Sequence, residues 1–403
     1  MRRDRPIGYA LLAILAVIAA GLSACSSGTD EPAAGKPAPS SAVDSPTTTT
    51  PPPEPVTVTA NPRNGARSVN PIDPITVSTQ NGTLRTVTLT NPAGDPVSGT
   101  YGAGRRSWRT TEVLGYGKTY TWSGTAIGAD DTTVPVRGRF TTIDPATTRA
   151  TINIGDGRTV GIAAPIIISF AGHVSDRAAV ERRLAVHSST PTAGAWAWLP
   201  DDATGSRVHW RPTHYWKAGT TVSVSAKLYG VPYGGGSYGR EDLTSDFSIG
   251  RAQITKADVN SFRLIVVRDG RQVMNFPASY GKADDPERNT RNGIHVVTEK
   301  FPLKLMSNPR YGYTNFPAKY AVRISNNGEF IHGNPDTVGI QGSGNVTHGC
   351  VNLSIENAHK YYESALYGDP VEVVNSPVGM TANDGDIYDW AIPWAEWQGL
   401  SAL

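Results

Sequence analysis

One short stretch, residues 331–354, holds the side chains best suited to nucleophilic chemistry. It contains Cys350, His332 and His348, together with five glycines. A thiol needs a base to form the reactive thiolate near neutral pH, and imidazole is the side chain whose pKa suits that task. Glycines such as Gly349 let the backbone bend so that N–H groups point at one spot, as in sites that stabilise an oxyanion. The pattern predicts acyl transfer by a thiol.

The two cysteines of the chain, Cys25 and Cys350, occur in very different contexts. Cys25 ends the sequence Leu-Ser-Ala-Cys, after an arginine-rich start and an apolar run. This resembles a bacterial lipobox, which predicts cleavage before Cys25, a lipid on that cysteine, and anchorage at the outer face of the plasma membrane. A plain signal peptide or a membrane anchor is the alternative, but the apolar run is short for a spanning helix of about 20 residues. Cys350 then has no partner, and an unpaired thiol in an exported protein is expected to be reactive rather than an inert core residue.

Length and composition indicate how the chain is divided into domains. The 403 residues leave room for two to three domains, and a net charge of +2 offers no basic excess that would favour nucleic acid. Residues 1–25 are the predicted lipoprotein signal. Residues 26–55 are rich in Pro, Thr and Ser, and such a segment cannot bury enough apolar surface to fold, so a tether is expected.

Residues 56–145 and 146–250 each contain short alternating strands separated by turn residues. This spacing predicts two antiparallel sandwiches of immunoglobulin type, without a disulfide. The Trp-Arg pair at Trp108 recurs at Trp210, about one sandwich domain later, which favours a divergent tandem repeat.

Two local features of the second sandwich carry their own predictions. A short helix is expected near residues 176–184, with Ser175 as its cap. Residues 233–238 are expected to form a flexible loop, whose two tyrosines contact sugar or peptide or, as the favoured alternative, lie at an exposed hairpin tip.

The third region, residues 251–375, is expected to be β-rich with one clear helix at residues 354–362, which Ser354 would cap. Strands are expected at residues 262–267, 272–274, 293–298, 320–325, 328–332 and 371–374.

Two motifs of this region, His332-Gly333 and Thr347-His348-Gly349-Cys350, match a known family. They resemble the L,D-transpeptidases of bacterial cell-wall synthesis, in which a His-Gly precedes a Ser-His-Gly-Cys; Thr347 replaces the common serine with another hydroxyl. The layout resembles the mycobacterial members, including a Trp-rich segment at residues 376–403. The resemblance implies a mainly β fold: two immunoglobulin-like sandwiches, then a β-rich catalytic domain with a short helix.

The resemblance also implies roles for the motif residues. Cys350 would be the nucleophile and His332 its base, with the Gly333 carbonyl orienting the imidazole. Backbone N–H groups of His348, Gly349 and Cys350 would stabilise the oxyanion. The His348 ring is open to two interpretations, orienting the cysteine loop by hydrogen bonding or acting electrostatically on the thiolate.

The implied substrates are peptidoglycan tetrapeptide stems, joined in 3→3 cross-links with release of D-alanine, and carbapenems are implied as covalent inhibitors. Tyr313, Asn327, Gly328 and Asn352 would line the substrate site under a flap at residues 300–317, although Tyr313 could instead be a flap packing residue. No cofactor and no metal are expected; zinc bound by the two histidines and the cysteine would lack a fourth ligand in the motif. The rival functions are an L,D-carboxypeptidase that uses water as acceptor and a non-catalytic lipoprotein that binds the cell wall.

Overall fold

The computed structural model describes residues 54–385 and 387–403. The predicted signal segment, Cys25 and nearly all of the predicted tether lie outside these residues. Within the described part of the chain, no helix is both long and apolar enough to cross a membrane.

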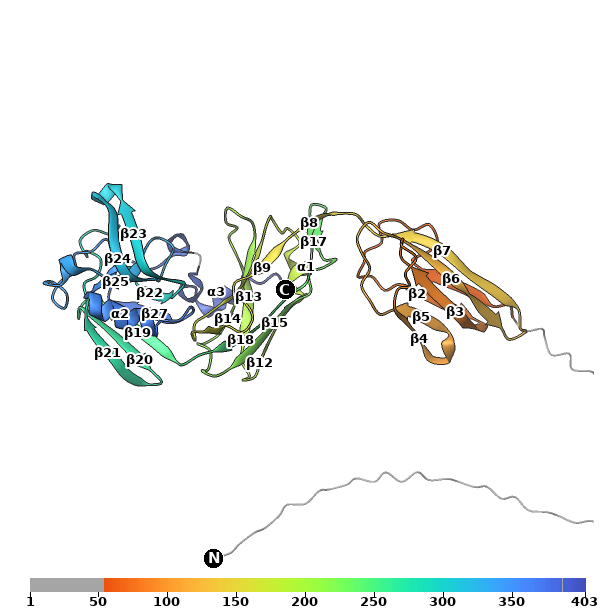
Figure 1. The fold of residues 1–403 in the computed structure, drawn as a ribbon, viewed down its shortest axis with the longest axis horizontal. Helices are drawn as coiled ribbons and strands as arrows, with labels where there is room; N and C mark the ends of the chain where they lie inside the picture. Colours follow the sequence, from red (N-terminus) through yellow and green to blue (C-terminus); the bar gives the residue numbers. More distant parts are fainter. Residues whose placement is uncertain (1–53, 386) are drawn as a thin grey trace, which may run out of the picture. The chain divides into compact units, whose positions relative to one another are not determined.

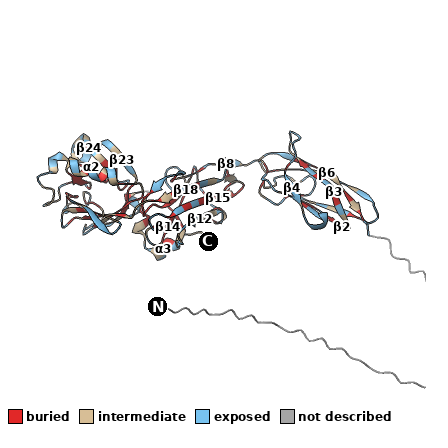
Figure 2. Ribbon diagram, turned by 60° about the horizontal axis from the view of Figure 1, so that its bottom comes forward, coloured by how far each residue is buried: buried red, intermediate tan, exposed pale blue. Residues whose placement is uncertain are grey.

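The first sandwich consists of two antiparallel sheets, with strand orders β1-β2-β5-β4 and β3-β6-β7. Buried and exposed residues alternate along much of β3 and β6, as expected for strands with one face on a core (Figure 2). The elements are β1 (Thr57–Asn61), β2 (Thr76–Gln80), β3 (Gly82–Thr90), β4 (Gly99–Tyr101), η1 (Ala103–Arg105), β5 (Ser107–Thr110), β6 (Thr119–Gly128) and β7 (Thr133–Thr141).

The second sandwich also has two sheets, with orders β13-β14-β11-β9 and β10-β18-β15-β12, antiparallel except for the parallel pair β10–β18. A small third sheet, β16-β17-β8, flanks it. The elements are β8 (Ala146–Thr148), β9 (Ala150–Ile152), β10 (Thr159–Val160), β11 (Ile166–Phe170), α1 (Arg177–Glu181), β12 (Leu184–Ser188), β13 (Gly194–Leu199), β14 (Arg207–Pro212), β15 (Thr221–Ala226), β16 (Pro232–Gly234), β17 (Ser237–Gly239) and β18 (Leu243–Ile249).

The two repeated tryptophans occupy the same place in both sandwiches. Trp108 lies on β5 between β2 and β4, and Trp210 lies on β14 between β11 and β13. Each ring lies against a glycine of the neighbouring strand: a Cβ atom on Gly99 would be 1.9 Å from the Trp108 ring, and one on Gly194 would be 2.1 Å from the Trp210 ring. The glycines are therefore required for the tryptophans to pack, and the predicted repeat has a structural counterpart in both domains.

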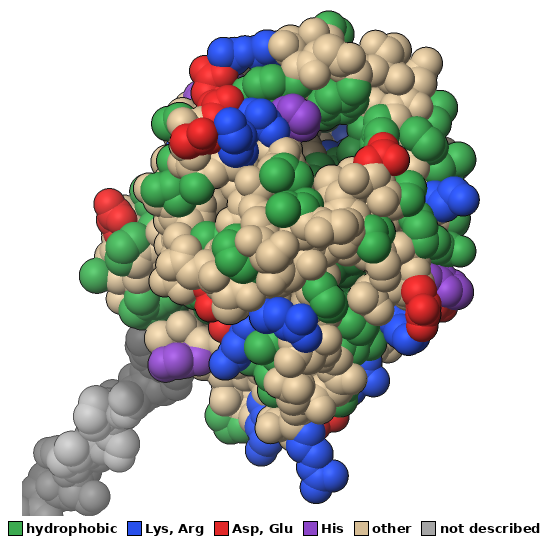
Figure 3. All heavy atoms as spheres, turned by 90° about the vertical axis from the view of Figure 1, so that its left-hand side faces the viewer, with side chains coloured by type: hydrophobic (Ala, Val, Ile, Leu, Met, Phe, Trp, Pro, Cys, Tyr) green, Lys and Arg blue, Asp and Glu red, His purple; other side chains and the backbone are tan. Residues whose placement is uncertain are grey.

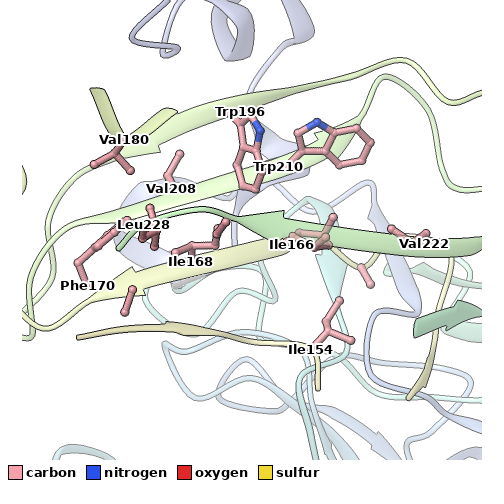
Figure 4. Close-up of a cluster of buried hydrophobic side chains, with 14 of the residues drawn as sticks. Ile154, Ile166, Ile168, Phe170, Val180, Trp196, Val208, Trp210, Val222 and Leu228 are labelled. Carbon is pink, nitrogen blue, oxygen red and sulfur yellow. The ribbon is translucent and has the colours of Figure 1, made fainter. Parts of the chain in front are cut away.

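The core of the second sandwich is built from β-branched and aromatic side chains, with Trp196 and Trp210 on neighbouring strands (Figure 4). Two local predictions here were wrong. The cap of α1 is Asp176, whose carboxylate accepts from the N–H of Ala179, and not Ser175. Tyr233 is not at an exposed hairpin tip: it is 1% exposed, and its ring packs edge-on against Phe170 at 5.3 Å.

The third domain pairs two sheets, β21-β20-β19-β27-β22 and β23-β24-β25-β26, around a common core that includes helix α2 (Figure 1). Its elements are β19 (Gln253–Asp258), β20 (Arg263–Arg268), β21 (Arg271–Pro277), β22 (Gly293–Val296), β23 (Glu299–Asn308), η2 (Pro309–Tyr311), β24 (Tyr313–Arg323), β25 (Phe330–Gly333), η3 (Pro335–Thr337), β26 (Val351–Leu353), α2 (Ile355–Ser364) and β27 (Pro370–Val374). Ser354 caps α2 as predicted, because its hydroxyl accepts from the N–H of Asn357.

Strands β23 and β24 form a long hairpin that projects from the second of these sheets (Figure 1). The sequence pattern predicted only residues 320–325 as a strand here, whereas β24 begins at Tyr313. The hairpin coincides with the flap that the family resemblance implied. On the face drawn in Figure 3, acidic and basic side chains are interspersed among hydrophobic and uncharged ones.

The segment after β27 contains η4 (Ala382–Asp384), η5 (Asp389–Ala391) and α3 (Trp394–Gln398). Its last part packs on the second sandwich: the indole N–H groups of Trp390 and Trp397 donate to the carbonyls of Ala163 and Ala195, both at 2.9 Å. Arg211 lies 4.7–5.1 Å from the rings of all three tryptophans of the segment. The Trp-rich stretch is thus a structural connection to the sandwich.

Candidate active site

A cavity of about 220 Å³ lies beneath the β23–β24 hairpin. It brings together five of the residues predicted from the sequence with six others. The lining residues are Met306, Tyr313, Phe316, His332, Asn334, Thr337, Val346, Thr347, His348, Cys350 and Asn352. The hairpin, β25, the loop before β26 and β26 itself all contribute, so segments about 40 residues apart in sequence form one site.

His332 lies on β25 with only 3% of its surface exposed. Its Nδ1 is 3.1 Å from the Gly333 carbonyl oxygen. A carbonyl can only accept, so this hydrogen bond assigns the proton to Nδ1 and leaves Nε2 as the acceptor. Position 333 is tightly packed, because a Cβ there would lie 2.7 Å from the terminal methyl group of Ile355 of α2 and 3.1 Å from its Cα. Burial lowers the pKa of His332 to about 4, so the ring is neutral at physiological pH.

Cys350 directly precedes β26, which pairs in parallel with β25 and so places the thiol beside the His332 strand. The thiol is free, and its Sγ lies 3.6 Å from the carbonyl oxygen of Gly328. Burial raises the pKa of Cys350 to about 12. In the part of the chain that is described, Sγ and the imidazole make no hydrogen bond with one another. The resting site is therefore a neutral thiol and a neutral imidazole that share one cavity.

The loop that carries Cys350 is closed by the hydroxyl of Thr347. This hydroxyl donates to the Cys350 carbonyl at 2.6 Å and accepts from the N–H of Gly349 at 3.3 Å. Gly349 has φ +113°, a left-handed conformation that favours glycine. Because the Gly349 N–H is already bonded to Thr347, the candidates for oxyanion binding narrow to the N–H groups of His348 and Cys350.

Replacing Thr347 with valine is expected to slow acylation of Cys350 about tenfold, because the isosteric side chain cannot bridge the loop and the nucleophile loses its fixed position. Thr347→Ser, which keeps the hydroxyl, is expected to stay close to the parent rate. The rate of acyl-enzyme formation, followed by intact-protein mass spectrometry, checks both. Equal loss in the two variants would show that the methyl group rather than the hydroxyl matters.

The His348 ring is exposed and contacts the tip of the hairpin. Its centroid lies 4.7 Å from that of Tyr311 and 5.4 Å from that of Tyr313. Partial burial, followed by the charge of Arg288, lowers the pKa of His348. Among the described residues its ring forms no hydrogen bond, so the loop-orienting interpretation finds no support in this geometry. The same part of the chain holds no group of three or more His, Cys, Asp or Glu side chains placed to bind a metal ion.

Of the four predicted substrate-binding residues, two line the cavity and two do not. Tyr313 and Asn352 line the cavity. Asn352 is 3% exposed and its amide oxygen has no hydrogen-bond partner, so this oxygen is available to a donor on a ligand. Asn327 instead donates to Asp384 at 3.2 Å and lies outside the cavity lining. Gly328 faces the thiol through its carbonyl.

Some residues that shape the site gave no signal in the sequence. Thr290 is buried, and its hydroxyl donates to the Gly349 carbonyl at 2.8 Å while accepting from the Gly281 N–H at 3.0 Å. Arg288 donates to the carbonyl of Thr347 at 3.1 Å. Both lie about 60 residues upstream of the cysteine loop, and neither belongs to a motif. Only the folded arrangement shows that they hold the loop.

Comparison with known proteins identifies the family of the chain. The profile of the L,D-transpeptidase catalytic domain matches residues 253–373, and that of a bacterial Ig domain matches residues 66–232. The chain belongs to the L,D-transpeptidase family. L,D-transpeptidase 5 of Mycobacterium tuberculosis is 54% identical over 347 residues, which cover 86% of this chain and 77% of the relative. L,D-transpeptidase 2 of the same organism is 36% identical over 353 residues, covering 86% and 85% of the two chains.

Solved structures of L,D-transpeptidases resemble part of the chain. That of LdtMt1 in complex with imipenem is 33% identical, with a TM-score of 0.48, and the match covers 57% of this chain and 99% of that one. An L,D-transpeptidase from Mycobacterium smegmatis is 31% identical, with a TM-score of 0.46 and coverage of 56% and 98%.

Proposed function

We propose that this L,D-transpeptidase forms 3→3 cross-links between peptidoglycan stem peptides through a thioester on Cys350. The observation that carries the proposal is the hydrogen bond from His332 Nδ1 to the Gly333 carbonyl, which leaves the basic Nε2 free in the cavity that Cys350 also lines. A neutral, buried imidazole next to a neutral thiol is arranged to take a proton at the moment of attack.

The reaction follows from this pair. Nε2 of His332 takes the thiol proton as Sγ attacks the carbonyl of the third residue of a tetrapeptide stem. The oxyanion of the tetrahedral intermediate is stabilised by the N–H groups of His348 and Cys350. The C–N bond to the terminal D-alanine then breaks, and the proton on Nε2 passes to the leaving amine. A side-chain amine of a second stem attacks the thioester, gives its proton to His332, and the Cys350 thiol is restored.

The remaining lining residues fit a peptide ligand. The unpartnered amide oxygen of Asn352 would accept from a stem N–H, and Tyr313 would cover the bound stem from the hairpin. Gly328 would contact substrate only after the thiol releases its carbonyl. We retain Asn327 as a substrate contact only for a conformation in which it leaves Asp384.

Carbapenems are proposed as covalent inhibitors of the same thiol. A β-lactam carbonyl is an acyl donor that lacks a leaving group able to diffuse away, because the broken C–N bond stays tethered in the opened ring. The predominantly apolar rim formed by Met306, Phe316 and Val346 suits such a compact bicyclic ligand.

Export and lipid anchorage through Cys25 at the outer face of the plasma membrane are likewise proposed, on the residues of the N-terminal segment alone. The domain limits 56–145, 146–250 and 251–375 stay predictions.

The deciding experiment is mass spectrometry of the protein incubated with a disaccharide-tetrapeptide, beside a Cys350→Ala control. Cross-linked dimer with loss of D-alanine, only when the thiol is present, supports the transpeptidase. Tripeptide without dimer would make the enzyme an L,D-carboxypeptidase. Neither product nor any adduct on Cys350 would leave the non-catalytic wall-binding lipoprotein.

A further inference from the structure

The turn between β24 and β25 lies directly against the nucleophile. Its Gly328 carbonyl accepts a hydrogen bond from the Cys350 thiol, at 3.6 Å. Gly328 has φ +101°, so the direction of this carbonyl depends on how the turn is held. What fixes the turn therefore bears on the position and reactivity of Sγ.

One support is the carboxylate of Glu329, which is buried with 4% of the residue exposed. One of its oxygens accepts from the N–H of Arg291 at 2.8 Å, and the other lies 3.6 Å from Nδ1 of His295. Its Cγ lies 3.6 Å from the point where a Cβ on Gly349 would be, so the side chain packs behind the cysteine loop. A buried carboxylate is costly unless partnered. Here Oε1 is hydrogen-bonded by the segment before β22, and Oε2, which has no hydrogen-bond partner among the described residues, faces His295 on β22.

A second support comes from the C-terminal segment. Asp384 is 7% exposed, and its carboxylate accepts from Nε of Arg291 at 2.9 Å and from the side-chain amide of Asn327 at 3.2 Å. Its backbone carbonyl also accepts from the N–H of Asn327 at 3.2 Å. Thr381 fixes the carboxylate by donating from both its N–H and its hydroxyl, at 2.6 and 2.9 Å.

Arg291 joins the two supports, because its N–H binds Glu329 while its guanidinium binds Asp384. Asp384 therefore holds the turn through hydrogen bonds to Asn327 and, through Arg291, is linked to Glu329, which packs behind the cysteine loop. We call the contacts among Asn327, Asp384 and Arg291 the clamp. The charged or titratable groups that face Glu329 are Arg291, His295 and, across Gly349, Cys350. Burial raises the pKa of Glu329; burial also raises the pKa of Cys350, and the negative charge of Glu329 adds to that increase.

We infer that Glu329 and Asp384 are positioning residues for acyl transfer, which act through the turn at residues 325–329 on the Cys350 thiol. The inference rests on the proposed function for its kinetic part only. It gives Thr381 and Asp384 of the C-terminal segment a part in positioning the nucleophile, although the sequence motifs end well before them. It also explains why Asn327 does not face the cavity: its side chain serves the clamp.

Two isosteric variants test the inference. Asp384→Asn removes the charge that holds Arg291, and a misdirected nucleophile is expected to lower kcat about tenfold with KM changed less than about twofold. Its effect is expected to be non-additive with Asn327→Ala, because both break the same clamp.

Glu329→Gln removes the negative charge beside the thiol, so the pH midpoint for alkylation of Cys350 by iodoacetamide is expected to fall by at least about half a pH unit.

The matched control is Asp369→Asn, since Asp369 is also a buried carboxylate paired with an arginine, Arg251, but contacts neither the turn nor the cysteine loop. It is expected to lower thermal stability while leaving kcat and the alkylation midpoint unchanged. An equal loss of kcat in this control, or additive effects of the Asp384 and Asn327 variants, would reduce Asp384 to a structural role. An unshifted alkylation midpoint in Glu329→Gln would remove Glu329 from the inference. Alkylation of Cys350 needs no stem peptide. If the parent protein is alkylated normally but forms no cross-linked dimer, the proposed function is refuted. The alkylation midpoint of Glu329→Gln still tests the role of Glu329 in that case.

Discussion

Replacing His332 with glutamine is expected to slow acylation of Cys350 about 10³- to 10⁴-fold at pH 7. The reason lies in the environment of the thiol. With a pKa of about 12 for Cys350, only about one molecule in 10⁵ carries a free thiolate at pH 7. Attack therefore depends on a base that removes the proton during the reaction, and His332 is the one imidazole buried in the cavity. Glutamine preserves the approximate shape but cannot take a proton.

The pH dependence makes this prediction specific. Without the base, acylation of the variant is expected to rise about tenfold per pH unit between pH 7 and 10, as hydroxide generates the thiolate. The parent should already be at its plateau in this range, because the pKa of His332 is about 4 and the base is neutral throughout. Acyl-enzyme formation with a carbapenem, measured by intact-protein mass spectrometry, gives both profiles, with Cys350→Ala as the unreactive control. A variant that reacts at the parent rate near pH 7 would mean that another group serves as base.

Replacing Trp397 with alanine is expected to destabilise the protein by about 3–5 kcal/mol, the range for removing a large buried aromatic side chain. Trp397 is fully buried, and its loss would leave a cavity against Ala197 and Leu199 of β13. The substitution would also remove the hydrogen bond to the carbonyl of Ala195 and one of the three aromatic rings that contact Arg211, which is 3% exposed. Thermal unfolding followed by calorimetry measures the effect.

Two comparison variants separate the contributions. Trp397→Phe keeps most of the volume but loses the N–H, so it is expected to destabilise less than Trp397→Ala. Trp394→Ala changes a half-buried ring that also contacts Arg211, and a smaller loss is expected there. If Trp394→Ala destabilised the protein as much as Trp397→Ala, the contact with Arg211 and not the buried volume would be the main contribution.

The strands were predictable where one face of a sheet meets a core and the other meets solvent. Alternation of apolar and polar residues marked β3 and β6, and Ser354 with its downstream apolar residues marked α2. Tyr233 was misplaced because glycines follow it, which is typical of an exposed turn, whereas its ring reaches Phe170 more than 60 residues upstream. Likewise the hairpin was underestimated, since β23 and β24 cover a cavity rather than a continuous core, and their pattern of burial is irregular.

At the site, Cys350, His332 and Gly333 were identifiable because their chemistry is local and lies in two short motifs. The residues that hold the cysteine loop and the neighbouring turn could not be identified from the sequence. Thr290, Glu329 and Asp384 are ordinary residue types in unremarked positions, and they become meaningful only when long-range packing brings them to the cysteine loop and its neighbouring turn. Long-range packing also adds a contact that the motif did not predict: Asn327, predicted to contact substrate, donates to a carboxylate of the C-terminal segment.

The attachment of the Trp-rich segment to the second sandwich sets an order for folding during synthesis. His209 and Asp389 form a fully buried pair at 3.0 Å across 180 positions of sequence, and Glu181 of the same sandwich accepts from the N–H of Ala402 at 2.8 Å. Until those later residues leave the ribosome, the sandwich has the His209 imidazole without Asp389, Arg211 without its covering tryptophans, and a Glu181 carboxylate with Trp198 as donor but without Ser401 and Ala402. The second sandwich is therefore translated before the catalytic domain but can reach its final form only after it.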